Sequence, residues 1–409
     1  MVSRLRTVTF HPTSAGVSCP HCGSPVGVYR IIQSNRNETK GCCPKCRKWF
    51  VIELPVVRKK LVYLDQSLLS EFCSSADSLN EEQIEQRILR KLQQLKDRQK
   101  VFIVVSDIHS AETAAFPQEY ADQRDKLWQF QNTLADGRIS GNWSDVFIAQ
   151  QHRALAAPEA PEYFPSEDIG LDNPHRWRIG VKILPTNAWR GRLHRAIPKS
   201  SNFNEQVSLI LTRQVSALGP APKARGAINH IRTLWRKNIE EGIAAERKWR
   251  QLTQSGGLVE SLAYHVPDVL PQIPDSPFKG IVRAVINGLD EEAVFEAWLR
   301  QLKTGAACAA LRLRIALEAE LLWSRAQGYG LSQKKFNENY GLSRQSDIDH
   351  VSAFVPYVDV LTIDQDMHNL CGREMATEEF GKFHCRLISK KDYPEFDAWL
   401  DTLLFEGRA

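Results

Sequence analysis

Two matched cysteine motifs near the start constrain the fold of this chain more than any other feature. Cys19-Pro-His-Cys22 and Cys43-Pro-Lys-Cys46 share one spacing and are separated by 20 residues. Each motif places two thiolates about one tetrahedral edge apart, so together they predict a closed four-thiolate zinc site of the structural kind. A segment of about 50 residues buries too little surface to fold alone, and metal ligation supplies the missing free energy.

Cys42 is an alternative ligand beside Cys43, but only Cys43 reproduces the spacing of the first motif. A short β-prone run follows each motif. Residues 17 to 54 thus resemble a zinc ribbon, a small β-hairpin module common in nucleic-acid machinery. The resemblance implies a first domain over residues 1–56. Zinc ribbons also bind proteins or merely brace a neighbouring domain, so the partner stays open, and the excess of basic residues favours nucleic acid.

The remaining cysteines, Cys73, Cys308, Cys371 and Cys385, lack ligand spacing and are expected to be small buried residues. No apolar run reaches the roughly 18 residues of a membrane span, and the first residues lack the apolar core of a signal peptide. We therefore expect a cytoplasmic protein with no membrane contact, whose thiols are reduced or bind metal.

Charge is unevenly distributed along the chain. Residues 1–60 hold 11 Lys and Arg against 2 Asp and Glu, and residues 176–250 hold 16 against 4, although the whole chain has a formal net charge of only +5. Two basic blocks beside an acidic remainder indicate one surface for an anionic polymer and another for cations. Two solvated basic faces without a partner are the alternative.

Residues 58–409 alternate between strand-like and helix-like patterns. Residues 61–64 and the unbroken apolar run 101–105 are expected strands, as are 357–363 and 384–389. An amphipathic helix is expected from Asn80, and a last helix over 393–405. Apolar strands between helices predict an α/β fold with a parallel sheet covered on both faces.

Carboxylates follow three of these strand-like runs or begin a helix. They are Asp65, Glu112, Asp347 and Asp364. In an open parallel sheet, ligands bind beyond the carboxyl ends of the strands, so these side chains are expected in one pocket. A divalent cation would relieve their mutual repulsion, and hard oxygen donors suit Mg²⁺ or Mn²⁺.

The order and spacing of these acids resemble the acidic signature of PIN-domain nucleases. In that family an Asp ends the first strand, a Ser and a Glu six residues apart follow the second, a third acid opens a later helix, and a fourth lies in a Thr-x-Asp turn. Here those positions are Asp65, Ser106 with Glu112, Asp347 and Asp364. The resemblance implies a PIN-like sheet sandwiched by helices and a metal-dependent endoribonuclease, of the kind that includes toxins, RNA-processing enzymes and antiviral defence effectors.

The chain departs from the family where more than 200 residues separate the second and third acids. We interpret residues 150–335 as a large, mostly helical, basic insertion. Asp349 is an alternative to Asp347 as the third ligand, and Asp366 could assist Asp364. An Asp-x-x-His pattern found in a PIN-like subgroup favours Asp347 and gives His350 a role at the site. His109 and Ser106 are possible assisting residues, with a structural histidine and a helix cap as their alternatives.

The basic insertion interleaves cations with tryptophans, a combination that suits phosphates and unpaired bases. The expected RNA-binding residues are Arg178, Arg190, Arg192, Arg236 and Lys237. Tryptophans packed in a core and covered by arginine stems are the alternative. Two other functions compete with a ribonuclease. One is a non-catalytic zinc-ribbon adaptor that binds RNA or a protein regulator, and the other is a DNA-directed flap-type nuclease.

Overall fold

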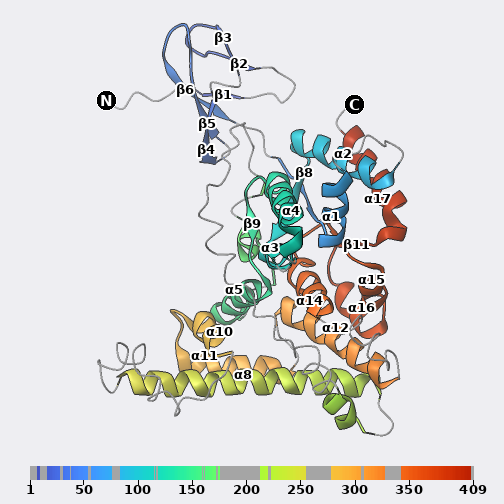
Figure 1. Ribbon diagram of the computed structural model, residues 1–409. Coiled ribbons are helices and arrows are strands. Elements are labelled where there is room, and N and C mark those ends of the chain that lie inside the picture. The colour runs from blue at the N-terminus through green and yellow to red at the C-terminus, as the bar shows by residue number, and fades with distance from the viewer. Residues whose placement is uncertain are drawn as a thin grey trace.

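A computed structural model describes most of the chain (Figure 1). The described residues are 7–9, 16–27, 31–36, 38–53, 57–75, 83–114, 116, 118–158, 160, 162–171, 174–175, 212–219, 223–254, 278–304, 308–327 and 342–406. None of the helices within these ranges has both the length and the apolar character needed to cross a membrane.

The first strands form a small module around the cysteines. A four-stranded sheet has the order β1-β6-β5-β4, and β2 pairs with β3 in a separate antiparallel hairpin. The strands are β1 (Thr7–Thr9), β2 (Gly16–Ser18), β3 (Pro25–Gly27), β4 (Ile31–Arg36), β5 (Glu38–Cys42) and β6 (Trp49–Glu53). The described core of this module holds four apolar side chains, Val17, Val26, Phe50 and Ile52, beside Cys19 and Cys43. Such a core is too small to hold the module together without further bonds.

A five-stranded parallel sheet is the centre of the remaining chain, as the sequence predicted. Its order is β11-β10-β7-β8-β9, and every neighbouring pair is parallel. The strands are β7 (Lys60–Tyr63), β8 (Val101–Ser106), β9 (Ile139–Ser140), β10 (Val360–Thr362) and β11 (Arg386–Ile388). The chain therefore starts in the middle strand, proceeds outward through β8 and β9, and returns to the other side of β7 for β10 and β11.

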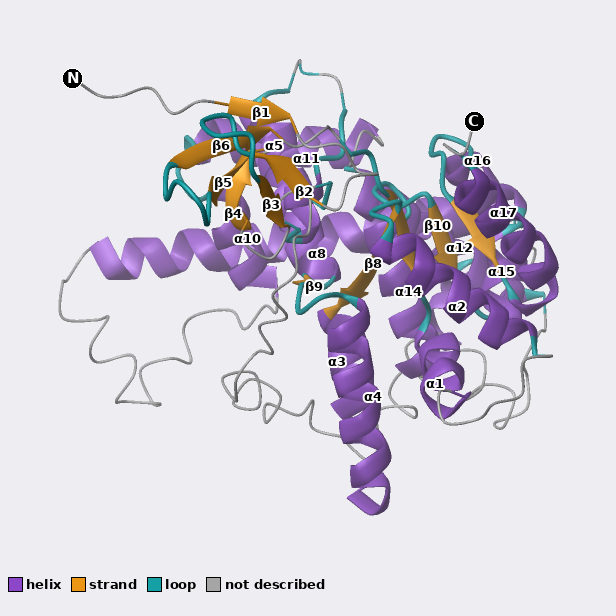
Figure 2. Ribbon diagram, turned by 90° about the horizontal axis from the view of Figure 1, so that it is seen from above, coloured by secondary structure: helices purple, strands orange, loops and turns teal. Residues whose placement is uncertain are grey.

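Helices cover both faces of this sheet (Figure 2). Alternate residues of the strands enter two separate apolar clusters: Leu61 and Tyr63 enter one, and Val62 and Leu64 the other. The helices around the sheet are α1 (Gln66–Ser75), α2 (Ile84–Asp97), α3 (Asp107–Ala114), α4 (Ala121–Leu134), α5 (Trp143–Ala156), α14 (Leu342–Phe354), α15 (Gln365–Cys371), α16 (Glu374–Phe380) and α17 (Tyr393–Phe405). Single turns of 3-10 helix lie at Gln118–Tyr120, Ser166–Ile169 and Lys390–Asp392.

Long helices occupy most of the described part of residues 224–326. They are α8 (Ala224–Gln254), α10 (Phe278–Ile286), α11 (Glu291–Thr304) and α12 (Ala309–Ala326), and α8 runs along one end of the molecule in Figure 1. Trp235 of α8 and Trp298 of α11 belong to the same apolar cluster as Tyr63. These helices therefore share a core with one face of the sheet.

Candidate functional site

The four predicted zinc ligands come together. The Sγ atoms of Cys19 and Cys46 lie 3.6 Å apart, as do those of Cys22 and Cys43, and all four sulfur atoms lie within 4.8 Å of one another. Zinc bonds of about 2.3 Å to a tetrahedron of sulfurs give an edge of about 3.8 Å, so this donor set fits a structural zinc ion. Cys42 lies outside the cluster, where its thiol donates to the carbonyl of Arg47.

Two thiols of this cluster, those of Cys22 and Cys46, differ in how readily they ionise. The hydroxyl and N–H of Ser24 lower the pKa of Cys22 to about 6. The N–H of Lys48 acts in the same direction on Cys46, but burial and the neighbouring cysteines outweigh it and raise the pKa of Cys46 to about 12. One thiolate thus forms readily and the last one does not, a conflict that a bound cation removes.

A second cluster of polar side chains lies at the carboxyl ends of the central strands. Asp65 follows β7, and its N–H donates to Oγ1 of Thr362, the last residue of β10, over 2.7 Å. Asp364 follows β10 and caps α15 by accepting the N–H of Met367. The strand order reverses between β7 and β10, and such a switch point is where open α/β sheets bind ligands.

Arg344 connects the acids around this switch point. Its guanidinium lies 3.3 Å from Oδ2 of Asp347, 3.3 Å from Oδ1 of Asp364 and 3.6 Å from Oδ2 of Asp366. Its side chain is only 6% exposed, whereas those of the three acids are 19%, 43% and 70% exposed. Arg344 is thus a buried cation that the acids surround, one turn before Asp347 on α14.

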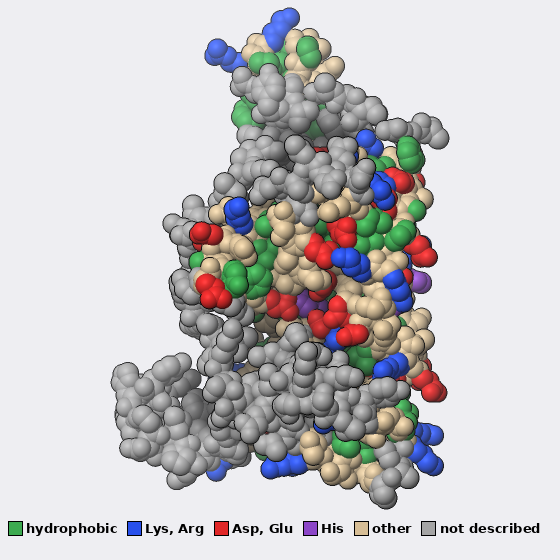
Figure 3. Space-filling view, turned by 45° about the vertical axis from the view of Figure 1, so that its right-hand side comes forward, with side chains coloured by type: hydrophobic (Ala, Val, Ile, Leu, Met, Phe, Trp, Pro, Cys, Tyr) green, Lys and Arg blue, Asp and Glu red, His purple; other side chains and the backbone are tan. Residues whose placement is uncertain are grey.

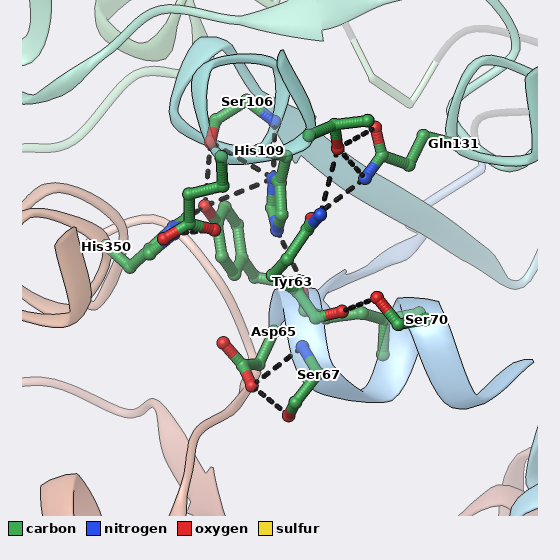
Figure 4. A network of polar contacts seen from close by, with 12 residues as sticks. Tyr63, Asp65, Ser67, Ser70, Ser106, His109, Gln131 and His350 are labelled. Atoms are coloured by element: carbon green, nitrogen blue, oxygen red, sulfur yellow. Dashed lines mark hydrogen bonds and ion pairs between the residues drawn. The ribbon is translucent and has the colours of Figure 1, made fainter. Parts of the chain in front are cut away.

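Glu112 belongs to α3 and contacts a buried network whose members Tyr63, Ser106 and His350 are labelled in Figure 4. Its Oε2 lies 3.4 Å from Nε2 of His350, and Nδ1 of His350 is hydrogen-bonded to the hydroxyl of Tyr63. That hydroxyl also lies 2.7 Å from Oγ of Ser106. Ser106, Tyr63 and His350 therefore form a continuous chain of hydrogen bonds that ends at a carboxylate.

The bonding of His109 fixes its tautomer. Its Nδ1 accepts the N–H of Ser106 over 3.0 Å, so Nε2 carries the proton and donates to the carbonyl of Leu64 over 2.7 Å. Burial and the neighbouring His350 lower the pKa of His109 to about 3. His109 is thus a neutral residue that ties the ends of β7 and β8 together and does not contact the carboxylates directly.

The pKa values of the acids differ because their partners differ. Burial raises the pKa of Asp65, and burial with the nearby charges of Asp364 and Asp65 raises that of Asp347 to about 8 despite Arg344. Burial opposes ionisation of Glu112 as well, but the hydrogen bond and charge of His350 outweigh it and lower the pKa of Glu112. Glu112 in turn raises the pKa of His350 against the effect of burial. The pKa values of Asp65 and Asp347 are therefore raised, and that of Glu112 is lowered.

The structure thus brings Asp65, Glu112, Asp347 and Asp364 to one end of the sheet, where Arg344 pairs with Asp347 and Asp364 and His350 contacts Glu112. In the described part of the chain, the four cysteines are the one group of three or more potential ligands whose donor atoms all lie within 4.8 Å. Figure 3 shows acidic side chains gathered beside a histidine on one face of the molecule. The charge of the acids is offset here by an arginine of the same chain.

The other predicted site residues have different surroundings. Asp349 forms an ion pair with Arg314, away from the Arg344 cluster. Arg236 and Lys237 pair with glutamates one turn later on α8. Arg178, Arg190 and Arg192 lie outside the described residues.

Two participants were not singled out from the sequence, Tyr63 and Arg344, whereas Thr362 is the threonine of the Thr-x-Asp turn. Tyr63 lies two residues before Asp65 and Arg344 three before Asp347, so strand and helix periodicity could have placed them near those acids. Family models, curated proteins and solved structures were compared with this chain, and none of them gives a significant match.

Proposed function

We propose that this chain is a metal-dependent endoribonuclease with a PIN-like catalytic domain and an N-terminal zinc ribbon. The observation that carries the proposal is the position of Asp65 and Asp364 on either side of the switch point, with Asp347 and Glu112 beside them. The order of these acids along the chain is the one that the PIN-like resemblance requires. In this proposal, residues between α5 and α14 are an insertion into that domain.

The donor chemistry supports a hard divalent cation at this site. Asp65, Glu112, Asp347 and Asp364 would hold Mg²⁺ or Mn²⁺, which would provide an activated water and offset charge on the phosphodiester. The raised pKa values of Asp65 and Asp347 show that ionising these acids together is unfavourable without added positive charge. The guanidinium of Arg344 provides part of that charge, and a bound cation would take over its pairs with Asp347 and Asp364.

The chain's own residues prepare the carboxylates for this task. Oδ2 of Asp65 accepts the N–H of Ser67 over 3.2 Å and also its hydroxyl, which fixes the carboxylate at the start of α1. His350 keeps Glu112 ionised and directs it toward the site. Arg344, once displaced from its acids, remains beside the site as a cation able to pair with a phosphate.

Cleavage assays test this function directly. Labelled single-stranded RNA and DNA of the same sequence are incubated with Mn²⁺ or Mg²⁺, then with EDTA, and then with the metal restored. We expect RNA cleavage that EDTA stops, and a loss of at least about 100-fold in Asp65→Asn and Asp364→Asn. Asp122→Asn, an exposed acid in the first turn of α4, should cleave like the wild type.

A second candidate function is a non-catalytic adaptor, which the pairing of Arg344 with three acids favours, because Arg344 offsets part of their negative charge without a metal. Absence of EDTA-sensitive cleavage of either substrate would support the adaptor. Cleavage of DNA alone would replace the ribonuclease with a flap-type nuclease.

A further inference from the structure

The two cysteine knuckles are built on the same backbone hydrogen bonds. In the first, the N–H of Gly23 donates to the carbonyl of Cys19 over 2.8 Å, and in the second the N–H of Arg47 donates to that of Cys43 over 2.9 Å. The N–H of each leading cysteine then donates to the carbonyl five residues later, over 2.9 and 3.1 Å. The first knuckle therefore shows which residues suffice for this scaffold.

The second knuckle differs from the first in charge. At each of the three positions that are neither cysteine nor proline, the second knuckle has a lysine or arginine where the first has an uncharged residue or a histidine. The matched positions are His21 and Lys45, Gly23 and Arg47, and Ser24 and Lys48. Because the first knuckle forms without these cations, metal binding does not account for them.

The backbone conformation of Arg47 also indicates that this residue has a role other than supporting the metal site. Its φ is 54°, and Gly23 at the matched position has a φ of 73°. This left-handed conformation suits glycine and is unfavourable for a residue with a side chain. An arginine at a position that favours glycine indicates a role for its guanidinium.

An exposed aromatic ring lies next to these cations. Trp49 follows Lys48 directly and is 46% exposed, whereas Phe50 after it is fully buried. Trp49 pairs with Cys42 across β5 and β6, and Lys40 lies on the same face, two pairs further along. In the part of the chain that the structure describes, no ion pair is formed by Lys40, Lys45, Arg47 or Lys48. An exposed indole beside unpaired cations suits a base stacked between phosphates.

We propose that the second knuckle, defined as Lys45, Arg47, Lys48 and Trp49, is a binding surface for single-stranded RNA. One base stacks on the indole of Trp49, and the three cations contact the phosphates on either side of it. The choice of RNA rests on the proposed function, whereas the surface itself rests on the comparison of the two knuckles. A protein partner for this surface is an outcome that the experiments below distinguish.

The first knuckle supplies the test variant. Arg47→Gly with Lys48→Ser gives two of the three positions the residues of the first knuckle, so the fold and a zinc content equal to that of the wild type should be kept. Binding of the full-length, zinc-loaded chain to a labelled single-stranded RNA is measured by fluorescence anisotropy without added Mg²⁺ or Mn²⁺, at several salt concentrations. We expect about tenfold weaker binding, and a slope of log K against log salt that is smaller by about 1.4 for two lost phosphate contacts. Lys382→Ser with Arg386→Ser, two exposed cations near β11, is the control of equal charge and should leave both values unchanged.

Trp49→Ala tests the stacked base separately. We expect single-stranded RNA to bind at least about fivefold more weakly and double-stranded RNA to bind as before, because paired bases do not expose their faces. Phe405→Ala, which removes a ring that is 61% exposed on α17, is the control and should change neither affinity.

The proposal is overturned if both knuckle variants bind single-stranded RNA like the wild type, an outcome that would favour a protein partner. It is also overturned if the control variants lose as much affinity as the knuckle variants do. These results are independent of cleavage: weaker binding without metal-dependent cleavage would remove the proposed function and keep this surface. Cleavage that depends on Asp65, with RNA binding unchanged in both knuckle variants, would keep the proposed function and remove this surface.

Discussion

Tyr63 links the sheet to both buried histidines through one hydroxyl group. In the neutral form of His350, Nδ1 accepts when Nε2 donates to Glu112, so the hydroxyl of Tyr63 donates to His350 and its oxygen accepts from Ser106. The ring itself is fully buried against Phe354. The hydroxyl therefore fixes the orientation of His350, and His350 fixes Glu112.

Tyr63→Phe should leave the packing intact and break this chain of hydrogen bonds. Buried polar groups of Ser106 and His350 would lose a partner, at a cost of about 1–3 kcal/mol in the free energy of unfolding. RNA cleavage should fall by about tenfold as Glu112 loses its fixed position. Denaturant unfolding and cleavage rates measure both effects. In Tyr393→Phe, where no hydrogen bond of the buried tyrosine's hydroxyl is seen within the described residues, both quantities should stay near those of the wild type.

Asp347 gives a pH dependence whose sign follows from its pKa. The carboxyl group keeps its proton up to about pH 8 in the folded protein, against an ordinary value of 3.8, because burial and nearby acids disfavour its charge. Folding therefore takes up a proton between these values, and stability falls as the pH rises through that range. Asp347→Asn cannot ionise at this position, so its stability should not show this fall with rising pH.

The difference is measured as the melting temperature at pH 6 and pH 9 without divalent cations. The melting temperature of Asp347→Asn, taken relative to that of the wild type, should be higher at pH 9 than at pH 6 by at least about 2 °C. Added Mg²⁺ should reduce the difference in melting temperature between the variant and the wild type at pH 9, since a cation at this site favours the ionised wild-type carboxylate. A gap that stays constant with pH would show that Asp347 is already ionised at pH 6.

The bounds of single helices and strands agree with the sequence prediction where the residues of one segment are enough to define the element. The apolar run at 101–105 became β8, buried along its whole length, and the last helix spans 393–405 as predicted. Helix α2 begins at Ile84, and its predicted start at Asn80 lies outside the described residues. Within residues 150–335, predicted to be mostly helical, the described residues form separate helices that include α11 and α12. Periodicity identifies the buried face of a helix but not the partner that limits its length.

Helix α8 contains two glycines at which substitution by alanine should have opposite effects on stability. A Cβ on Gly242 would lie 2.9 Å from Cβ of Phe278 and 3.0 Å from Cγ2 of Val282, so α8 and α10 would have to separate. A Cβ on Gly226 would meet nothing within 4 Å. Gly242→Ala should therefore destabilise the protein by about 1–3 kcal/mol, and Gly226→Ala should stabilise it by up to about 1 kcal/mol. Equilibrium unfolding of the two variants provides the comparison, and equal effects would contradict the close packing of α8 on α10.

The candidate site shows where prediction from sequence stops at the scale of the molecule. Local patterns placed each acid after its own strand or in its own helix, and the switch-point rule anticipated that they would share one end of the sheet. The pairing of Arg344 with Asp364, or of His350 with Glu112 across 238 positions, depends on the order of strands and on helix packing. No local pattern contains that information, and the central role of an arginine among the acids emerged only from the fold.

The separation between the cysteine module and the sheet leads to a prediction about metal removal. The buried residues of the module form their own small cluster, and neither cluster of the five-stranded sheet includes any of them. Zinc should thus be required for the module and not for the sheet. Cys43→Ser should lose the zinc and the hydrogen-exchange protection of strands β2, β3, β5 and β6, with protection of β7, β8 and β10 kept. Cys42→Ser changes the neighbouring thiol, which lies outside the four-sulfur cluster, and should retain both zinc and protection. Loss of protection in the sheet of Cys43→Ser would mean that the two parts fold as one cooperative unit.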